Sequence, residues 1–128
     1  MTFSNYRIGD FLIRIKNASL AGHETVECQC TKLIKSVAEA LKKEGFLESV
    51  KVKEGILTAK LAKANKKFVL TDIKLISRPG LRVYKNVSDL KNRKAGSSMI
   101  FLSTPKGILS NKDAVKQNVG GEVIMEVW

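Results

Sequence analysis

Five neighbouring residues in the last quarter of the chain combine two hydroxyls, a ring, an ammonium and a glycine: Ser103, Thr104, Pro105, Lys106 and Gly107. Hydroxyls donate and accept hydrogen bonds, and a lysine neutralises negative charge. The set therefore suits an exposed nucleic-acid base edge beside a phosphate. The same residues are also typical of an ordinary turn, and their chemistry alone favours that interpretation.

Acid–base and nucleophilic chemistry has few candidate side chains. His23 is the only histidine, and no cysteine or carboxylate cluster stands beside it. A general base would have to be Asp10, Asp72 or Glu122, and Glu122 could activate Ser103 only with a third, orienting group. No such group is evident. The sequence therefore predicts a protein without catalytic activity, metal, cofactor or small-molecule substrate.

The cysteines, Cys28 and Cys30, are two residues apart. Two thiols are too few for a structural zinc site, and this spacing is poor for a mutual disulfide. If residues 25–30 form a strand, both cysteines share a face with Val26. We expect them to be reduced and packed in the core as small apolar side chains.

The charge of the 128-residue chain is strongly positive, with 23 Lys and Arg against 12 Asp and Glu and a net charge of +11. A polyanionic partner relieves the repulsion within such a fold. The cations are spread along the whole chain rather than along one helix, which favours nucleic acid over a membrane surface. No apolar run approaches the roughly 18 residues that span a bilayer, and there is no leader, so we expect a soluble, cytosolic protein.

The first half predicts the order helix, strand, helix, strand, strand. The apolar stripes of the two helices are Ile8, Phe11, Leu12 and Ile15, then Ile34, Val37, Ala38 and Leu41. A connection is expected over residues 17–24, and Thr31 can cap the second helix. Residues 46–53 and 56–61 alternate as strands around a two-residue turn.

The second half predicts mainly strands with one short helix. A basic stretch around Lys63, Lys66 and Lys67 marks the boundary between two expected lobes, residues 1–64 and 65–128. The remaining expectations are strands at 68–77, 81–84, 99–102 and 122–128, a type II turn at 78–80, a helical turn at 89–94 and a helix start at 110–113. The expected fold is α+β, with an amino-terminal α/β lobe packed on a carboxy-terminal, mainly β lobe.

Five segments, in order and at matching spacing, resemble the bacterial-type ribosomal protein S-eight family of the small subunit. They are IGDFLIRIKN (8–17), KKEGFL (42–47), ISRPGLRVYK (76–85), LSTPKGIL (102–109) and VGGEVI (119–124). The resemblance implies the same two lobes and direct binding to the central domain of small-subunit ribosomal RNA, in support of assembly. It further implies feedback binding to the protein's own messenger, neighbours such as ribosomal proteins S-five and S-twelve, and a place in a bacterial or organellar ribosome.

The resemblance also implies which residues contact RNA. Ser103 and Thr104 match the family's Ser-Thr-Ser loop, with Pro105 in place of the third hydroxyl; Arg7 replaces a usual proline before the first helix. The predicted RNA-binding residues are Ser103, Thr104, Pro105, Lys106, Gly107, Gly120, Gly121, Glu122, Tyr84, Arg78, Arg82, Arg14, Lys32 and Lys35. Gly120 and Gly121 permit close backbone approach. The alternative to an RNA contact is core packing for Tyr84. For Arg14 it is a solvent-exposed position at the rim of the apolar stripe of the first helix.

The competing function is a free-standing RNA-binding translational regulator, which shares the whole charge argument. Co-sedimentation with small ribosomal subunits distinguishes the two.

Overall fold

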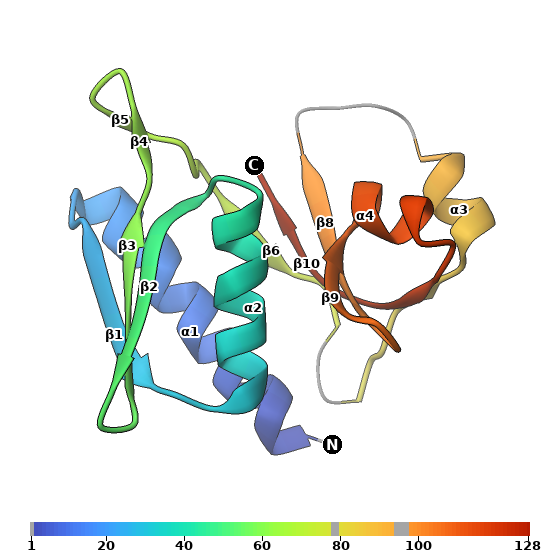
Figure 1. The fold of residues 1–128 in the computed structure, drawn as a ribbon, viewed down its shortest axis with the longest axis horizontal. Coiled ribbons are helices and arrows are strands. Elements are labelled where there is room, and N and C mark those ends of the chain that lie inside the picture. Colours follow the sequence, from blue (N-terminus) through green and yellow to red (C-terminus); the bar gives the residue numbers. More distant parts are fainter. Residues whose placement is uncertain (1, 78–79, 94–97) are drawn as a thin grey trace.

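The computed structural model describes residues 2–77, 80–93 and 98–128, with side chains from Ile8 onward. Figure 1 shows two lobes side by side, the first with two long helices on a sheet and the second mainly strands with short helices. The predicted α+β class is confirmed. Arg78 and Pro79, in the predicted type II turn, lie outside the described residues. Gly80 has the positive φ, 88°, that such a turn needs at its third position.

The first helix, α1 (Thr2–Ala21), buries the predicted stripe of Ile8, Phe11, Leu12 and Ile15. The predicted end was wrong, because α1 continues through most of the expected connection. Ala18 extends the buried stripe, and the helix ends where the His23 amide donates to the Ala18 carbonyl at 2.8 Å. The buried stripe thus continues one turn beyond Ile15, and Gly22, with a φ of 79°, directly follows the helix.

The rest of the amino-terminal lobe follows the predicted order. Strand β1 (Thr25–Gln29) precedes α2 (Lys32–Lys43), and β2 (Leu47–Lys53) and β3 (Ile56–Leu61) form a hairpin. The antiparallel sheet has the order β1-β3-β2. Thr31 caps α2 by accepting the Ile34 amide at 3.1 Å, as predicted. Glu54 and Gly55 both have positive φ, 52° and 78°, as a type I′ hairpin turn requires.

Cys28 lies on the inner face of β1 with Val26, as the alternation predicted, and Cys30 directly follows the last residue of the strand. Val26 is buried, and Cys28 and Cys30 are free, half-buried thiols that pack against the core. Partial burial raises the pKa of Cys28 above its usual value. Both side chains therefore act as small apolar groups at the margin of the core.

Most of the long strand expected at residues 68–77 does not form: Phe68 ends a hairpin that begins at Lys63, and only residues 73–75 form a later strand. Among the described strands, β4 (Lys63–Ala64) and β5 (Lys67–Phe68) pair only with each other, and β6 (Ile73–Leu75) follows separately. The positive φ of Asn65 and Lys66, 53° and 66°, turns the chain back at this point. The expected lobe boundary at 64/65 falls inside this hairpin.

The carboxy-terminal lobe is a five-stranded sheet with two short helices. Its further elements are β7 (Tyr84–Lys85), α3 (Val87–Lys91), β8 (Met99–Thr104), β9 (Gly107–Ser110), α4 (Asn111–Lys116) and β10 (Gly121–Val127). The sheet order is β6-β10-β8-β9, with β7 also paired to β10. Helix α3 starts before the expected helical turn, because Asn86 and Asp89 form a capping box. Ser110 caps α4, as predicted.

One apolar core joins the lobes. Phe101 of β8 packs edge-to-face on Phe46, with ring centroids 6.3 Å apart, and Lys43 of α2 forms a 2.8 Å ion pair with Asp113 of α4. Ile100 and Leu102, on the opposite face of β8, belong to a second cluster beneath α3 and α4. Residues 100–102 of β8 are therefore buried on both faces and anchor the strand that carries Ser103 and Thr104. None of the described helices is both long and apolar enough to cross a membrane.

Candidate RNA interface

The segment predicted as a loop is the tip of the β8–β9 hairpin. Strand β8 runs two residues beyond its predicted end, because Ser103 pairs with Ile108 and Thr104 with Gly107. Only Pro105 and Lys106 remain as the turn, and both are exposed. The tip is therefore a short, hydrogen-bonded structure rather than a loose loop.

The Thr104 hydroxyl organises this turn. It donates to the Gly107 carbonyl at 2.7 Å and accepts the Lys106 amide at 3.1 Å. A hydroxyl has one donor and two acceptor positions, so one acceptor position is left for a ligand. Gly107 has a φ of 106°, which a residue with a side chain rarely adopts. The sequence of the tip thus fixes its backbone.

Gly121 lies against the base of the hairpin. A Cβ atom at this position would collide with the Ser103 carbonyl oxygen, and one at Gly120 would lie 2.8 Å from the Cα of Asn86. Both glycines therefore allow a close backbone approach within the protein itself, to β8 and to the end of β7 with the residue that follows it. The two glycines let β10 enter the sheet between those strands.

Three predicted residues form a row across three strands. In the sheet register, Glu122 of β10 lies opposite Ser103 of β8 on one side and opposite Tyr84 of β7 on the other. Directly opposed residues share a face of a sheet. Further along β8 the same face carries Phe101, which packs on the amino-terminal lobe. We refer to Ser103, Glu122 and Tyr84 as the cross-strand row.

The ends of the cross-strand row differ from its centre in what they offer a ligand. Glu122 is held by Arg82, whose Nη1 lies 3.1 and 3.3 Å from the two carboxylate oxygens. Tyr84 is 68% exposed. This exposure is consistent with the predicted RNA contact and excludes the alternative that the ring packs in the core. Within the described residues the half-buried Ser103 hydroxyl has no hydrogen-bond partner. An exposed ring and a hydroxyl therefore flank a carboxylate that is already paired.

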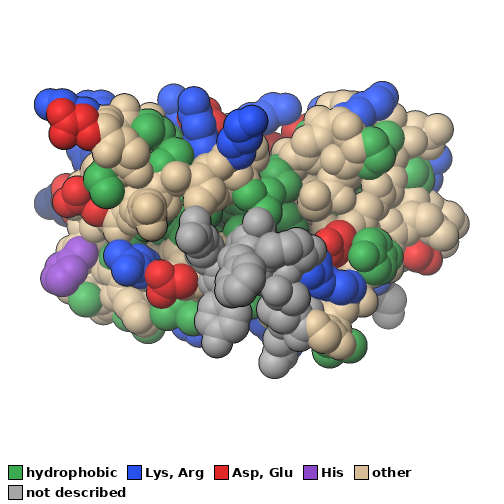
Figure 2. All heavy atoms as spheres, turned by 90° about the horizontal axis from the view of Figure 1, so that it is seen from below, with side chains coloured by type: hydrophobic (Ala, Val, Ile, Leu, Met, Phe, Trp, Pro, Cys, Tyr) green, Lys and Arg blue, Asp and Glu red, His purple; other side chains and the backbone are tan. Residues whose placement is uncertain are grey.

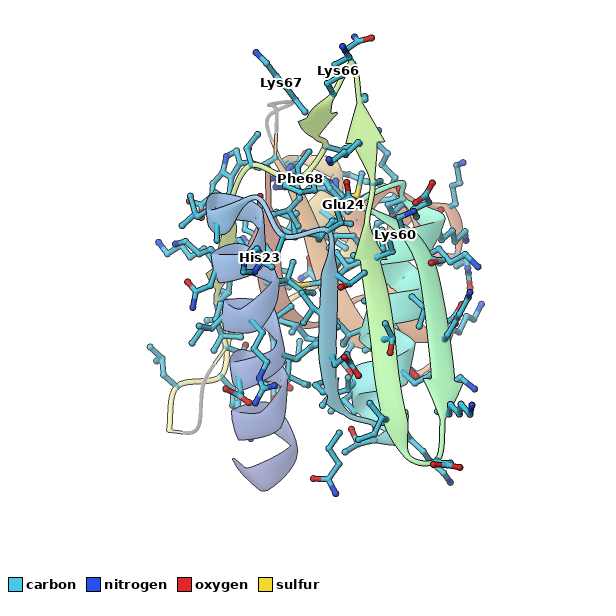
Figure 3. All side chains as sticks on the ribbon, turned by 90° about the vertical axis from the view of Figure 1, so that its left-hand side faces the viewer. His23, Glu24, Lys60, Lys66, Lys67 and Phe68 are labelled. Atoms are coloured by element: carbon cyan, nitrogen blue, oxygen red, sulfur yellow. The ribbon has the colours of Figure 1, made fainter. Side chains whose placement is uncertain are left out.

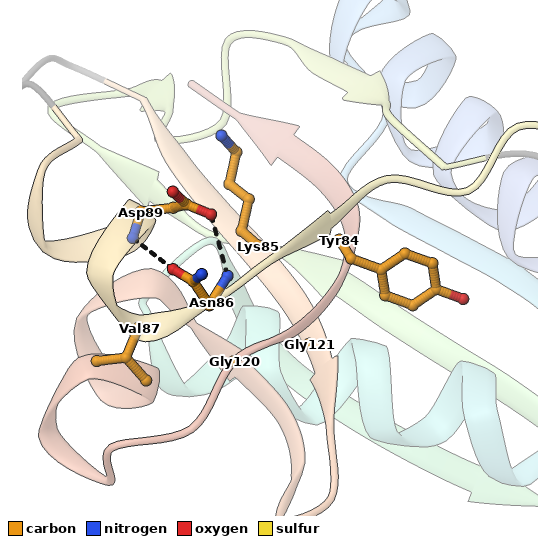
Figure 4. A pocket seen from close by; sticks show the side chains of 7 residues that line it. All are labelled: Tyr84, Lys85, Asn86, Val87, Asp89, Gly120 and Gly121. Carbon is orange, nitrogen blue, oxygen red and sulfur yellow. Dashed lines mark hydrogen bonds between the residues drawn. The ribbon is translucent and has the colours of Figure 1, made fainter.

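A hollow of about 430 Å³ lies beside the row. It is lined by Tyr84, Lys85, Asn86, Val87, Asp89, Gly120 and Gly121. Figure 4 shows Tyr84 and Lys85 pointing to opposite sides of β7, and the Asn86–Asp89 capping box closing one wall. The Tyr84 ring thus points away from the hollow. The Lys85 side chain lies on the same side of β7 as the hollow.

The other predicted cations lie apart from the row. Arg14 of α1 donates to the Glu27 carbonyl at 3.0 Å and pairs with Asp10 at 3.3 Å, so the amino-terminal lobe holds it. Lys32 and Lys35 are exposed in the first turns of α2. Seen from below, Lys and Arg side chains gather along one edge of the molecule, while charges of both signs mix elsewhere (Figure 2).

The carboxylates that could act as general bases are all paired. Asp10 binds Arg14, Glu122 binds Arg82, and Asp72 lies 3.1 Å from the Lys16 ammonium. The hydrogen bond from Lys16 lowers the pKa of Asp72 and makes it a weaker base. Among the described residues, no three His, Cys, Asp or Glu side chains are grouped so as to hold a metal ion.

Sequence reasoning did not find the Arg82–Glu122 pair or the β4–β5 hairpin. The pair depends on strand register, which is a long-range property. The hairpin had a local signal in Asn65, a residue type that tolerates positive φ.

Comparisons with known proteins cover both lobes. The family model described as "Ribosomal protein S8" matches residues 7–128. The chain is 45% identical over 126 residues to the small ribosomal subunit protein uS8 of Streptococcus sanguinis SK36, covering 94% of this chain and 96% of the relative. It is 44% identical, with the same coverage, to the protein of that name from Streptococcus pneumoniae serotype 19F strain G54.

Proposed function

The chain belongs to the ribosomal protein S8 family, and on this premise we propose that it binds the central domain of small-subunit ribosomal RNA directly and supports its assembly. Its role is structural rather than catalytic. The net charge of +11 supports this proposal, because each phosphate neutralised by a lysine or arginine releases counterions and favours association.

The observation that carries the RNA-binding proposal is the cross-strand row beside a fixed hairpin tip. Tyr84 presents an exposed ring on which a base can stack, and Ser103 presents a hydroxyl without a partner among the described residues. Both project from paired strands, and β8, which carries Ser103, is buried on both faces over residues 100–102. The row therefore keeps its shape when RNA binds, and little conformational entropy is lost.

The tip supplies complementary contacts. Among the described residues, Lys106 contacts a neutral carbonyl, that of Gln117 at 3.4 Å, and no carboxylate, so its positive charge is available to a phosphate. The remaining acceptor position of Thr104 suits a base amino group or a ribose hydroxyl. The deep, narrow major groove of regular A-form RNA hides base edges from side chains. The preferred target is therefore a distorted or partly unpaired helical element.

An RNA footprint of the purified protein on small-subunit ribosomal RNA tests the proposal. We expect a compact protected region within the central domain, and its loss when Ser103 and Tyr84 are both replaced by alanine. Protection only outside the central domain, or none, would overturn it.

The cellular setting follows from the same premise. We propose that the protein is cytoplasmic and resides in the small subunit of a bacterial or organellar ribosome, beside ribosomal proteins S-five and S-twelve, and that it also binds its own messenger. Co-sedimentation with small subunits and competition between messenger and ribosomal RNA fragments test these statements. Messenger binding without co-sedimentation would favour the free-standing regulator.

A further inference from the structure

The β4–β5 hairpin projects from the amino-terminal lobe. It pairs with no other strand of the described residues, and Figures 1 and 3 show it extending beyond the sheet, with Lys66 and Lys67 at its tip. Its base is tied to the lobe, because the Ala62 amide donates to the Phe46 carbonyl at 3.1 Å. The Val69 amide closes the base by donating to the Ala62 carbonyl at 3.0 Å. The hairpin is a defined protrusion with an anchored base.

The lysines at the base and at the tip have different surroundings. Lys63, at the base, lies 2.6 Å from a Glu24 carboxylate oxygen and 5.1 Å from the centre of the Phe68 ring. Lys60, on the adjoining β3, pairs with Glu48 at 3.0 Å. Lys66 and Lys67 have no such partner among the described residues. The sequence contains no Asp or Glu from residue 55 to 71, so the tip is locally unbalanced in charge.

The backbone of the tip gives a second, independent indication. A type I′ turn commonly has Asn followed by Gly, but here Asn65 is followed by Lys66 at a φ of 66°. A left-handed conformation costs a residue with a Cβ about 1 kcal/mol. Backbone strain of this kind is often retained where the side chain has a function, so it points to a role for the Lys66 side chain. The strained residue places an ammonium at the outermost point.

We propose that Lys66 and Lys67 form a second RNA contact, which binds phosphates of a segment other than the one held by the β8–β9 hairpin. The inference rests on the proposed RNA-binding function. Figure 1 shows the two hairpin tips on different lobes, one on the upper edge and one on the lower edge of the molecule, so one protein would connect two RNA segments. Two ammonium groups at a narrow tip recognise backbone charge and read no bases.

The contact is tested first by salt dependence. In Lys66→Ala/Lys67→Ala, binding to complete small-subunit ribosomal RNA should weaken on the order of 10-fold at moderate salt, and the slope of log affinity against log salt should become shallower by about 1.5. Lys66→Arg/Lys67→Arg should bind like the parent. Lys51→Ala/Lys53→Ala removes the same charge from exposed positions on β2 and should have a smaller effect. Equal losses in the two alanine variants would overturn the inference.

Photocrosslinking locates the contact without altering either lysine. A photoreactive side chain in place of Ala64, which is exposed and paired across the hairpin with Lys67, should crosslink to one RNA segment. The same group in place of Pro105 should crosslink to another. If only the Pro105 probe reacts with RNA, the second contact is wrong and the proposed function stands. If neither reacts, the proposed function fails as well.

Discussion

Thr104 and Gly107 close the β8–β9 hairpin through a 2.7 Å hydrogen bond from the threonine hydroxyl to the glycine carbonyl. Thr104→Val removes this bond and the hydroxyl's acceptor for the Lys106 amide while keeping the side-chain shape. We expect specific RNA binding to weaken by about 1–2 kcal/mol, since the tip loses its fixed geometry and one ligand acceptor. Filter binding measures this loss, and Thr104→Ser should restore most of it. A serine variant as weak as the valine variant would show that the hydroxyl is not responsible.

Lys106→Ala should act on all RNAs alike. Its ammonium contacts a carbonyl rather than a carboxylate, so its removal takes away charge that is available to phosphate. The parent's affinity for RNA should fall at least about 10-fold between low and moderate salt. For the variant, the slope of log affinity against log salt should be shallower by about the contribution of one phosphate contact. Titrations with ribosomal and unrelated RNAs at several salt concentrations measure both quantities. Selective loss for ribosomal RNA would instead assign Lys106 to base recognition.

Gly121→Ala should destabilise the fold and the interface together. Its methyl group would collide with the Ser103 carbonyl, and separating β8 from β10 should cost about 2–3 kcal/mol of unfolding free energy. Gly22→Ala is the control, because that glycine has a positive φ and open space around it. It should cost about 1 kcal/mol and leave RNA binding unchanged. Urea unfolding and RNA titration of both variants make the comparison; equal effects would contradict the steric argument.

Cys28→Ala and Cys30→Ala should affect stability and leave RNA binding intact. Both thiols pack at the margin of the core and away from the cross-strand row, so each truncation should cost about 1 kcal/mol. Thermal unfolding and RNA titration separate the two effects. Reduced RNA binding at an unchanged melting temperature would contradict this assignment, as would stoichiometric zinc in the purified parent.

The features predicted correctly from the sequence are local ones. The stripes of α1 and α2 follow helical periodicity, and the Thr31 and Ser110 caps depend on residues three positions away. The type I′ turn at Glu54 and Gly55 has an equally local signal. Such features are specified by residues within one element or turn, and tertiary packing supplies most of their stability.

The features that were missed depend on register or on departures from residue preference. Ser103, Glu122 and Tyr84 were separate motifs in the sequence, and only the pairing of three strands shows that they form one row. The β4–β5 hairpin was missed because Lys66 stands where glycine is usual. Both failures fall at the RNA-binding surfaces proposed here, where selection for a ligand competes with local preference.

The ion pair at the base of the β4–β5 hairpin should give a pH-dependent stability. The hydrogen bond and charge of Lys63 lower the pKa of Glu24 from its usual 4.5 in the folded state. A carboxyl whose folded pKa is depressed stabilises the fold above its unfolded pKa, and this contribution is lost as pH falls through the folded value. Glu24→Gln should therefore be slightly less stable than the parent at pH 7, and the difference should shrink as the pH falls below 4.5.

Urea unfolding of both proteins at pH 7 and in acid measures this difference. Glu39→Gln is the matched control, because Glu39 is exposed on α2 and has no partner among the described residues. Its difference from the parent should stay near zero at both pH values. Since both members of the Lys63–Glu24 pair are substantially exposed, added salt should reduce the effect of Glu24→Gln at pH 7. A deficit for Glu24→Gln that persists undiminished in acid would mean that the glutamate supports the hairpin through packing rather than charge.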